Sequence, residues 1–204
     1  MRVLVVAGHP DDEILGVGGT ILRHVENGDE VHVHIACCHG LRDREQRIAD
    51  AERVRDAIGC DYSFGWLPEL STTERDARPV VERLVADHAP DIVYTHHPGD
   101  LNRDHRALNE AVAVACRPYA SAIRSLRWFE TPSSTEWGTG QFRPSLFVAV
   151  DASHKARLLE MYASETRPLP HPRHPISLMH RAYYWGSIAG LTAAEPFEVV
   201  RETW

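Results

Sequence analysis

The sequence lacks the long apolar runs, the basic excess and the cysteine pairs that mark three common classes of protein. No apolar run is long enough to span a bilayer, and no basic n-region with an apolar h-region opens the chain, so we expect a cytoplasmic protein without membrane insertion. The formal net charge of −7 argues against nucleic acid or an anionic membrane as the main partner. The four cysteines form no C-x-x-C pair, which predicts small buried thiols rather than a disulfide framework or a zinc knuckle.

Length and composition are ordinary, but the histidine content is not. The 204 residues suit one domain, spanning 1–204, that is large enough to bury a substantial core. A hydrophobic content of 43% and a charged content of 25% are typical of a globular protein. The unusual number is the 13 histidines.

Strand and helix signals alternate along the chain. Residues 2–8, RVLVVAG, are apolar and rich in β-branched side chains, which predicts a central strand buried on both faces. From Asp12, apolar residues recur at helical spacing until Gly28 supplies the stop. By the same signs we expect further strands at 30–38, 61–64, 91–97, 125–130, 145–150 and 196–200, further helices at 44–59, 77–88, 105–116, 153–164 and 178–189, and a proline-rich loop at 167–175.

This alternation predicts an α/β fold with a three-layer, mostly parallel, Rossmann-like sheet and helices on both faces. The GVGG run at 16–19 is not a dinucleotide fingerprint, because it falls inside the first predicted helix rather than at the turn before it. His32 and His34 alternate with apolar residues in the second predicted strand. We expect them to share one strand face under a helix, in a structural role.

Polar residues end or follow three of the predicted strands, at the sheet edge where ligands bind in such folds. These segments are HPDDE at 9–13, CCH at 37–39 and DLNRDH at 100–105. A helix N-terminus alone would account for HPDDE, with a proline before the first turn and acids that complement the helix dipole. Capping needs one acid and no histidine, however, and the Asp104-His105 pair repeats the pattern at a second junction. The convergence favours a reaction centre.

Two imidazoles and one carboxylate, with a coordination position left for water, are a common catalytic zinc set. His9 and Asp12 can both face a metal from a tight turn that enters a helix, and His105 would complete the set from the opposite loop. Asp11 then remains as an unligated carboxylate beside the bound water, where a general base is needed. Zinc lowers the pKa of that water to about 7, and the base takes its proton as hydroxide attacks a carbonyl.

The residues behind this hypothesis resemble the LmbE-like, or PIG-L-like, zinc-dependent N-deacetylase family. The hallmark of that family is similar to A-x-HPDDE at 7–13 followed by the DH pair at 104–105. Arg47 lies in a segment that resembles the family's R-x-x-E helix, although Asp50 stands where the acid is usually Glu. Residues 146–165 and 180–201 resemble the family's later segments, so the resemblance covers nearly the whole chain.

The resemblance implies a hydrolase that removes an N-acetyl group from an amino sugar, such as N-acetylglucosamine, or from a sugar conjugate. It implies zinc as the cofactor, with iron(II) or another divalent metal as the alternative, a small-molecule partner, and a homo-oligomer. The implied metal ligands are His9, Asp12 and His105. Asp11 would activate water, Asp104 would orient a neighbouring polar group, and Arg47 would bind a sugar hydroxyl or a phosphate of the substrate.

The chain departs from the family at Asn102. Three residues before the metal-binding histidine, the better-known members carry a histidine that stabilises the oxyanion or protonates the leaving amine. Asparagine can donate a hydrogen bond to an oxyanion but cannot deliver a proton. Either Asn102 and the metal hold the oxyanion while Asp11 returns its proton to the amine, or another histidine, His97 or His39, has taken over.

Three other functions remain open on the sequence alone. A non-haem iron oxygenase uses the same ligand types, but those proteins are usually β-barrels. A metal-dependent phosphoesterase also fits the ligands, although a second metal usually needs more bridging carboxylates. The third is a metal- or sugar-binding module without turnover, with Asn102 as its sign. A turnover assay separates that module from an enzyme.

Overall fold

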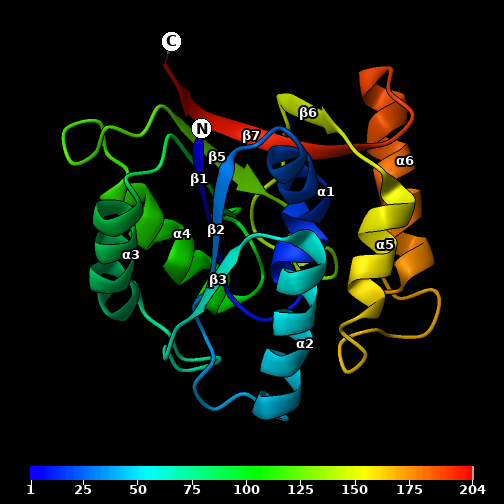
Figure 1. Ribbon diagram of the computed structural model, residues 1–204, viewed down its shortest axis with the longest axis horizontal. Coiled ribbons are helices and arrows are strands. Elements are labelled where there is room, and N and C mark those ends of the chain that lie inside the picture. The colour runs from blue at the N-terminus through cyan, green and yellow to red at the C-terminus, as the bar shows by residue number, and fades with distance from the viewer. Residues whose placement is uncertain (204) are drawn as a thin grey trace.

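A seven-stranded sheet forms the middle of the molecule (Figure 1), of which the computed structural model describes residues 1–203. The strand order is β3-β2-β1-β4-β5-β7-β6. The first five strands in this order are parallel, and β7 runs antiparallel to β5 and β6. The strands are β1 (Arg2–Ala7), β2 (Glu30–Ile35), β3 (Asp61–Phe64), β4 (Ile92–His96), β5 (Ser125–Phe129), β6 (Leu146–Ala149) and β7 (Ala194–Glu202).

Within residues 1–203, six α-helices cover the two faces of the sheet, which confirms the predicted α/β fold with a mostly parallel sheet. Helices α3 and α4 lie on one side in Figure 1, and α1, α2, α5 and α6 lie on the other. None of these helices is both long enough and apolar enough to cross a membrane. The helices are α1 (Asp12–Glu26), α2 (Arg44–Ile58), α3 (Glu74–His88), α4 (Arg103–Ala115), α5 (Ala152–Glu160) and α6 (Pro175–Ala189), and a short 3₁₀-helix, η1, spans Thr135–Trp137.

Alternate residues of β1 supply the two cores that flank the sheet. Val3 and Val5 pack in a cluster with apolar side chains of α1 and α2, whereas Leu4 and Val6 pack in a cluster with those of α3 and α4. All four side chains are buried. Because both faces of β1 are covered, its sequence from Val3 to Ala7 is an uninterrupted apolar run, and the polar residues of the site follow where the strand ends.

Three helices begin earlier than their periodicity predicts, because a polar side chain caps each of them. The side chains of Thr73, Asn102 and His174 each accept a backbone N–H from the following turn. Helices α3, α4 and α6 therefore start at 74, 103 and 175 rather than at the predicted 77, 105 and 178. The cap on α4 matters most, because it fixes Asn102 at the point where β4 delivers the chain to its next helix.

Helix α1 approaches the elements around it closely along its GVGG run. A Cβ atom on Gly16 would lie 2.2 Å from a ring carbon of Phe129. A Cβ atom on Gly19 would lie 2.7 Å from the side chain of Val150. The glycines are therefore needed for close packing, in agreement with the prediction that they belong to the helix.

A buried ion pair reaches the middle of α1 from two other elements. Lys155 of α5 lies 2.6 Å from Glu195 of β7, and both side chains are almost fully buried. Lys155 Nζ donates to the carbonyl oxygen of Leu15 at 2.9 Å. Glu195 accepts the backbone N–H groups of Gly19 and Thr20 at 2.8 and 2.7 Å. These bonds fix the helix whose first residue, Asp12, belongs to the candidate site.

Candidate active site

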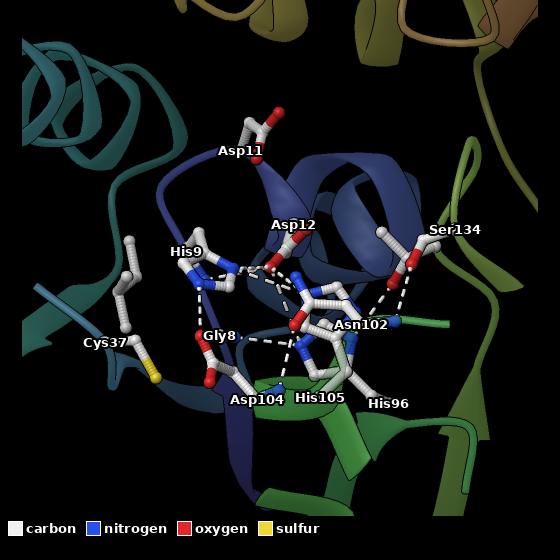
Figure 2. Close-up of polar contacts among 12 residues, drawn as sticks. Gly8, His9, Asp11, Asp12, Cys37, His96, Asn102, Asp104, His105 and Ser134 are labelled. Atoms are coloured by element: carbon white, nitrogen blue, oxygen red, sulfur yellow. Dashed lines mark hydrogen bonds and ion pairs between the residues drawn. The ribbon is translucent and has the colours of Figure 1, made fainter. Parts of the chain in front are cut away.

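Three of the predicted site residues meet at the carboxyl ends of β1 and β4 (Figure 2). His9 lies in the turn after β1, Asp12 is the first residue of α1, and His105 lies in the first turn of α4. His9 Nδ1 and His105 Nε2 lie 3.2 and 2.9 Å from Asp12 Oδ2 and 3.3 Å from each other. All three side chains are buried, with His9 the most exposed at 6%. These three residues are called the triad below.

The spacing of the triad fits a tetrahedral metal ion. Two ligand atoms that are each about 2.1 Å from zinc lie about 3.4 Å apart at a tetrahedral angle. The observed separations of 3.2, 2.9 and 3.3 Å are each somewhat shorter than that value. Asp12 Oδ1 is buried and has no hydrogen-bond partner. Neutral imidazole and carboxylate are ligand types that zinc and iron(II) both accept. The residues present therefore fit a divalent metal.

Electrostatics at the triad also favour a cation. Although burial opposes the shift, the carboxylates of Asp12 and Asp100 raise the pKa of His105 to about 10. Burial likewise opposes ionisation of Asp12, yet His105 and His9 hold the pKa of that carboxyl well below its usual range. The acidic groups thus stabilise a positive charge at this buried site.

Each imidazole of the triad has a carboxylate at its other nitrogen. His9 Nε2 lies 3.1 Å from Asp104 Oδ2, and His105 Nδ1 lies 3.2 Å from Asp100 Oδ1. Asp104 also accepts the backbone N–H groups of Leu70 and Thr72 at 2.6 and 3.1 Å, which hold its carboxylate still. The sequence placed Asp100 in the polar segment but gave it no role. Such carboxylates fix the orientation and tautomer of a metal-binding histidine.

His96 packs against the triad through His105. No role was assigned to this residue from the sequence. Its ring stacks on that of His105, with the centroids 3.7 Å apart and the planes 10° from parallel. His96 Nε2 accepts the N–H of Gly8 at 2.8 Å, and Nδ1 lies 2.9 Å from the hydroxyl of Thr131. Burial lowers the pKa of His96 to about 3, so this ring is neutral. His96 therefore packs against the triad as an uncharged ring whose position is fixed by contacts at both nitrogens.

Asp11 lies beside the triad rather than within it (Figure 2). Its carboxylate is fully buried: Oδ2 accepts a hydrogen bond from Arg173 Nη1 at 3.0 Å, and Oδ1 has no partner. Its backbone has a φ of 113°, which is strained for a residue with a side chain. Burial raises the pKa of Asp11 to about 8, and the charge of Arg173 opposes that rise.

Asn102 presents a free amide NH2 group at the site. Its Oδ1 accepts the N–H of Asp104 at 2.9 Å as the cap of α4. That bond fixes which end of the amide is the oxygen and leaves the Nδ2 donors for another partner. Asn102 and His9 line the same cavity, whose volume is about 480 Å³. The amide is thus held at the cavity wall by the geometry of the helix terminus.

Arg47 also lines this cavity, from α2, and is buried between two acids. Its Nε lies 2.9 Å from Glu165 Oε1, and its Nη1 lies 3.6 Å from Glu69 Oε1. Asp50, which replaces the glutamate usual in the family, lies 2.6 Å from Arg53 Nη2 on the same helix. Arg47 is therefore placed at the cavity that adjoins the triad, and Asp50 is occupied within α2.

The two histidines considered as substitutes for the proton donor lie elsewhere. His97 Nε2 is 3.5 Å from Glu198 of β7, and its ring meets Trp128 edge-on. His39 is exposed and lies beside Trp66, with the ring centroids 6.4 Å apart. Neither histidine lines the cavity that His9 and Asn102 share. The structure does not bring either of them to the triad.

Comparison with known proteins places the chain among deacetylases. The family model PIG-L, GlcNAc-PI de-N-acetylase, matches residues 4–116. The uncharacterized deacetylase YaiS of Escherichia coli (strain K12) is 28% identical over 162 residues, with 72% of this chain and 81% of that protein covered. The family match spans more than half of the chain and includes both the HPDDE segment and the Asp104-His105 pair.

Solved structures share the fold at lower identity. The conserved protein TT1542 from Thermus thermophilus superposes with a TM-score of 0.77 at 22% identity, over 99% of this chain and 96% of that chain. The N,N′-diacetylchitobiose deacetylase from Pyrococcus horikoshii gives a TM-score of 0.75 at 16% identity, over 98% of this chain and 84% of that chain. At these identities the likeness shows the fold and leaves the reaction to the residues of the site.

Proposed function

The chain belongs to the PIG-L family, and we propose on that basis that it is a metal-dependent hydrolase that removes an N-acetyl group from an amino sugar or sugar conjugate. The observation that carries the proposal is the triad itself. Two imidazole nitrogens and a carboxylate oxygen converge to within 3.3 Å of one another, next to a buried acid whose side chain makes no capping bond. A deacetylase relative and a diacetylchitobiose deacetylase of the same fold support an N-acetylated sugar as the substrate class.

His9, Asp12 and His105 would hold the metal. A zinc or iron(II) ion in that position would supply a Lewis acid, which lowers the pKa of water and polarises a carbonyl. Asp104 keeps Nε2 of His9 as the protonated nitrogen, so that Nδ1 presents its lone pair to the ligand position. Asp100, in the loop directly before α4, lies 3.2 Å from His105 Nδ1 and would orient that ring through the same kind of contact.

Asp11 is the general base in this proposal. Its Oδ2 is held by Arg173, whereas Oδ1 is the oxygen without a partner and is the one available to accept a proton from the attacking water. With no histidine of the cavity wall free to protonate the leaving amine, Asp11 also returns that proton. One carboxyl group then works first as base and afterwards as acid.

Asn102 and Arg47 act on the substrate. The Nδ2 group of Asn102 donates to the oxygen of the acetyl carbonyl as negative charge develops there, which is where a fixed donor lowers the barrier most. Arg47, which lines the same cavity, binds a hydroxyl or phosphate of the sugar. A cavity of about 480 Å³ admits a small sugar ring with its acetyl group.

A two-metal phosphoesterase is less consistent with the ligands. Among residues 1–203, the one other group of potential ligand atoms within 4.8 Å is His9, Cys37 and Asp104. It shares His9 with the triad, and Asp104 already holds that imidazole. Burial also raises the pKa of Cys37 to about 12, which disfavours the thiolate that a metal requires.

The test is acetate release from a panel of N-acetylated amino sugars and glycoconjugates by protein reconstituted with zinc or iron(II). We expect turnover that stops when the metal is removed. The Asp11→Asn variant should retain its metal and lose kcat by orders of magnitude. His180→Asn, on the exposed side of α6, should match the unmodified protein. Metal-loaded protein that cleaves none of the panel, but hydrolyses phosphate esters, would contradict the proposal.

A further inference from the structure

A chain of alternating charges runs along the cavity wall and ends on Asp11. Successive partners approach to 3.0, 3.3, 2.9 and 3.6 Å. This row of charged side chains connects elements from four parts of the fold. Glu165 lies at the middle of the row and is the shared partner of two arginines. In order, the members of the row are Asp11, Arg173, Glu165, Arg47 and Glu69.

Arg173 is the member that reaches the candidate base. It belongs to the proline-rich segment 167–175 between α5 and α6, and it lies 162 positions from Asp11 in the sequence. Its Nη1 donates to both Asp11 and Glu165, and its Nε donates to the hydroxyl of Ser133 at 3.0 Å. Three partners in different segments thus fix the plane of this guanidinium.

Among residues 1–203, no other group makes a hydrogen bond to the Asp11 side chain that would set its orientation. Its backbone N–H is held by Glu13 Oε2 at 3.2 Å, but that bond leaves the carboxylate free to turn. Of the two carboxylate oxygens, Arg173 binds Oδ2 and leaves Oδ1 unpartnered and buried. A partial rotation about the side chain would break the contact to Arg173 and turn the unpartnered oxygen away from the position where a proton is accepted.

We propose that Arg173 is a positioning residue, which holds Oδ2 of Asp11 so that Oδ1 faces the reacting water, with Glu165 linking this contact to Arg47. The link follows from the shared partner, because the carboxylate of Glu165 contacts both Arg47 and Arg173. A substrate oxygen that binds Arg47 therefore changes the contacts of the carboxylate that orients Arg173. This inference rests on the proposed function. It assigns a role in the reaction to the proline-rich segment, which otherwise has the appearance of a surface loop.

Two simpler roles for Arg173 make different predictions. If the ion pairs serve stability alone, replacing the arginine lowers the free energy of unfolding and leaves kcat per folded molecule unchanged. If Arg173 binds substrate directly, or covers Asp11 as a latch, its loss raises KM or increases kcat. A positioning role predicts a fall in kcat with KM nearly constant, and it predicts that the effect depends on Asp11.

The experiment is a double-mutant cycle on the metal-loaded full chain, with Arg173→Gln, Asp11→Asn and the double variant. We expect Arg173→Gln to lower kcat by about 30-fold, in the range for a misplaced catalytic group, at unchanged KM and metal content. In the Asp11→Asn background the same change should have no further effect. Arg173→Lys should keep part of the activity, and added guanidinium should restore part of it in Arg173→Ala.

Arg157→Gln, an exposed arginine of α5, is the matched control and should behave as the unmodified chain. Four results would each overturn the positioning role. Three concern the Arg173→Gln variant by itself: full kcat, a rise in KM alone, or loss of its metal. The fourth is an equal loss of kcat whether residue 11 is aspartate or asparagine. If Arg173→Gln does not fold, the lysine variant and guanidinium rescue decide the matter. An unmodified protein that releases no acetate from any substrate overturns the proposed function, and this role with it.

Discussion

His9 contacts Asp104 through Nε2 at 3.1 Å, whereas its Nδ1 faces Asp12 and His105. The two nitrogens of the His9 ring therefore have different roles. Nε2 orients the imidazole through Asp104, and Nδ1 faces the ligand position. The backbone N–H groups of Leu70 and Thr72 immobilise Asp104 in turn. The geometry of the triad thus depends on the carboxylate of Asp104, which is not itself a member of the triad.

Replacing Asp104 by asparagine should weaken metal binding. The amide is uncharged and orients the imidazole less firmly, and loss of such a partner typically costs about 10- to 100-fold in affinity. Competition with a chromophoric chelator measures the change. Asp87→Asn, at the exposed end of α3, serves as the control. Unchanged affinity in Asp104→Asn would show that the contact to His9 does not orient a metal ligand.

Asn102 combines two roles that two substitutions can separate. Asn102→Ala removes both the cap of α4 and the free donor, so we expect unfolding to become easier by about 1 kcal/mol and kcat to fall by about 100-fold. Asn102→Asp keeps a capping oxygen for the N–H of Asp104 but has no amide donor. It should keep the stability and still lose the activity. Normal turnover in Asn102→Asp would exclude Asn102 from oxyanion stabilisation.

Lys155, the only lysine in the sequence, should be essential for stability because its partner is buried. Lys155→Met leaves Glu195 as an uncompensated buried charge, and breaking such a pair costs about 3–5 kcal/mol. Urea unfolding at pH 7 measures this loss, with Arg157→Gln on the same helix as the control. A loss below about 1 kcal/mol would mean that Glu195 is satisfied by its two backbone bonds in α1 alone.

His34 should make folding sensitive to acid. Burial, with the charges of His32 and His88, lowers the pKa of His34 to about 4 from an ordinary value of 6.5. Between those values the unfolded chain binds the proton and the folded chain does not, so stability is complete above pH 6.5 and falls as the pH drops toward 4.

Unfolding free energies of the His34→Asn variant should therefore depend less on pH across this window. Asparagine retains a group that can bond to the hydroxyl of Ser63, which His34 Nδ1 contacts at 2.8 Å, but it does not titrate. His180→Asn, on the exposed side of α6, controls for the change of residue type. Parallel pH profiles for His34→Asn and the unmodified chain would show that His34 titrates normally in the folded state.

The sequence predicted the parts of the fold that periodicity controls. The apolar run of β1 and the helical spacing after Asp12 gave the right elements, because burial on one or two faces leaves a direct pattern in the sequence. Helix starts were less accurate, since Thr73, Asn102 and His174 extend their helices through capping bonds that periodicity does not show. His32 and His34 do share a strand face, where both contact Ser63.

The site was only partly predictable for a related reason. His9, Asp12 and His105 follow strands that are neighbours in the sheet, so parallel topology alone predicts that they meet. Arg173 lies in a proline-rich segment whose path depends on how α5 and α6 pack, and no local pattern marks it as a partner of Asp11. The stacking of His96 on His105 likewise depends on side-chain packing that spacing does not specify.

The most direct test of this account is anomalous diffraction at the zinc edge from crystals of the protein loaded with one equivalent of zinc. We expect one peak, within bonding distance of His9 Nδ1, the carboxylate of Asp12 and His105 Nε2. A peak between Cys37 and Asp104, or no ordered metal at the junction of β1 and β4, would contradict the proposed chemistry.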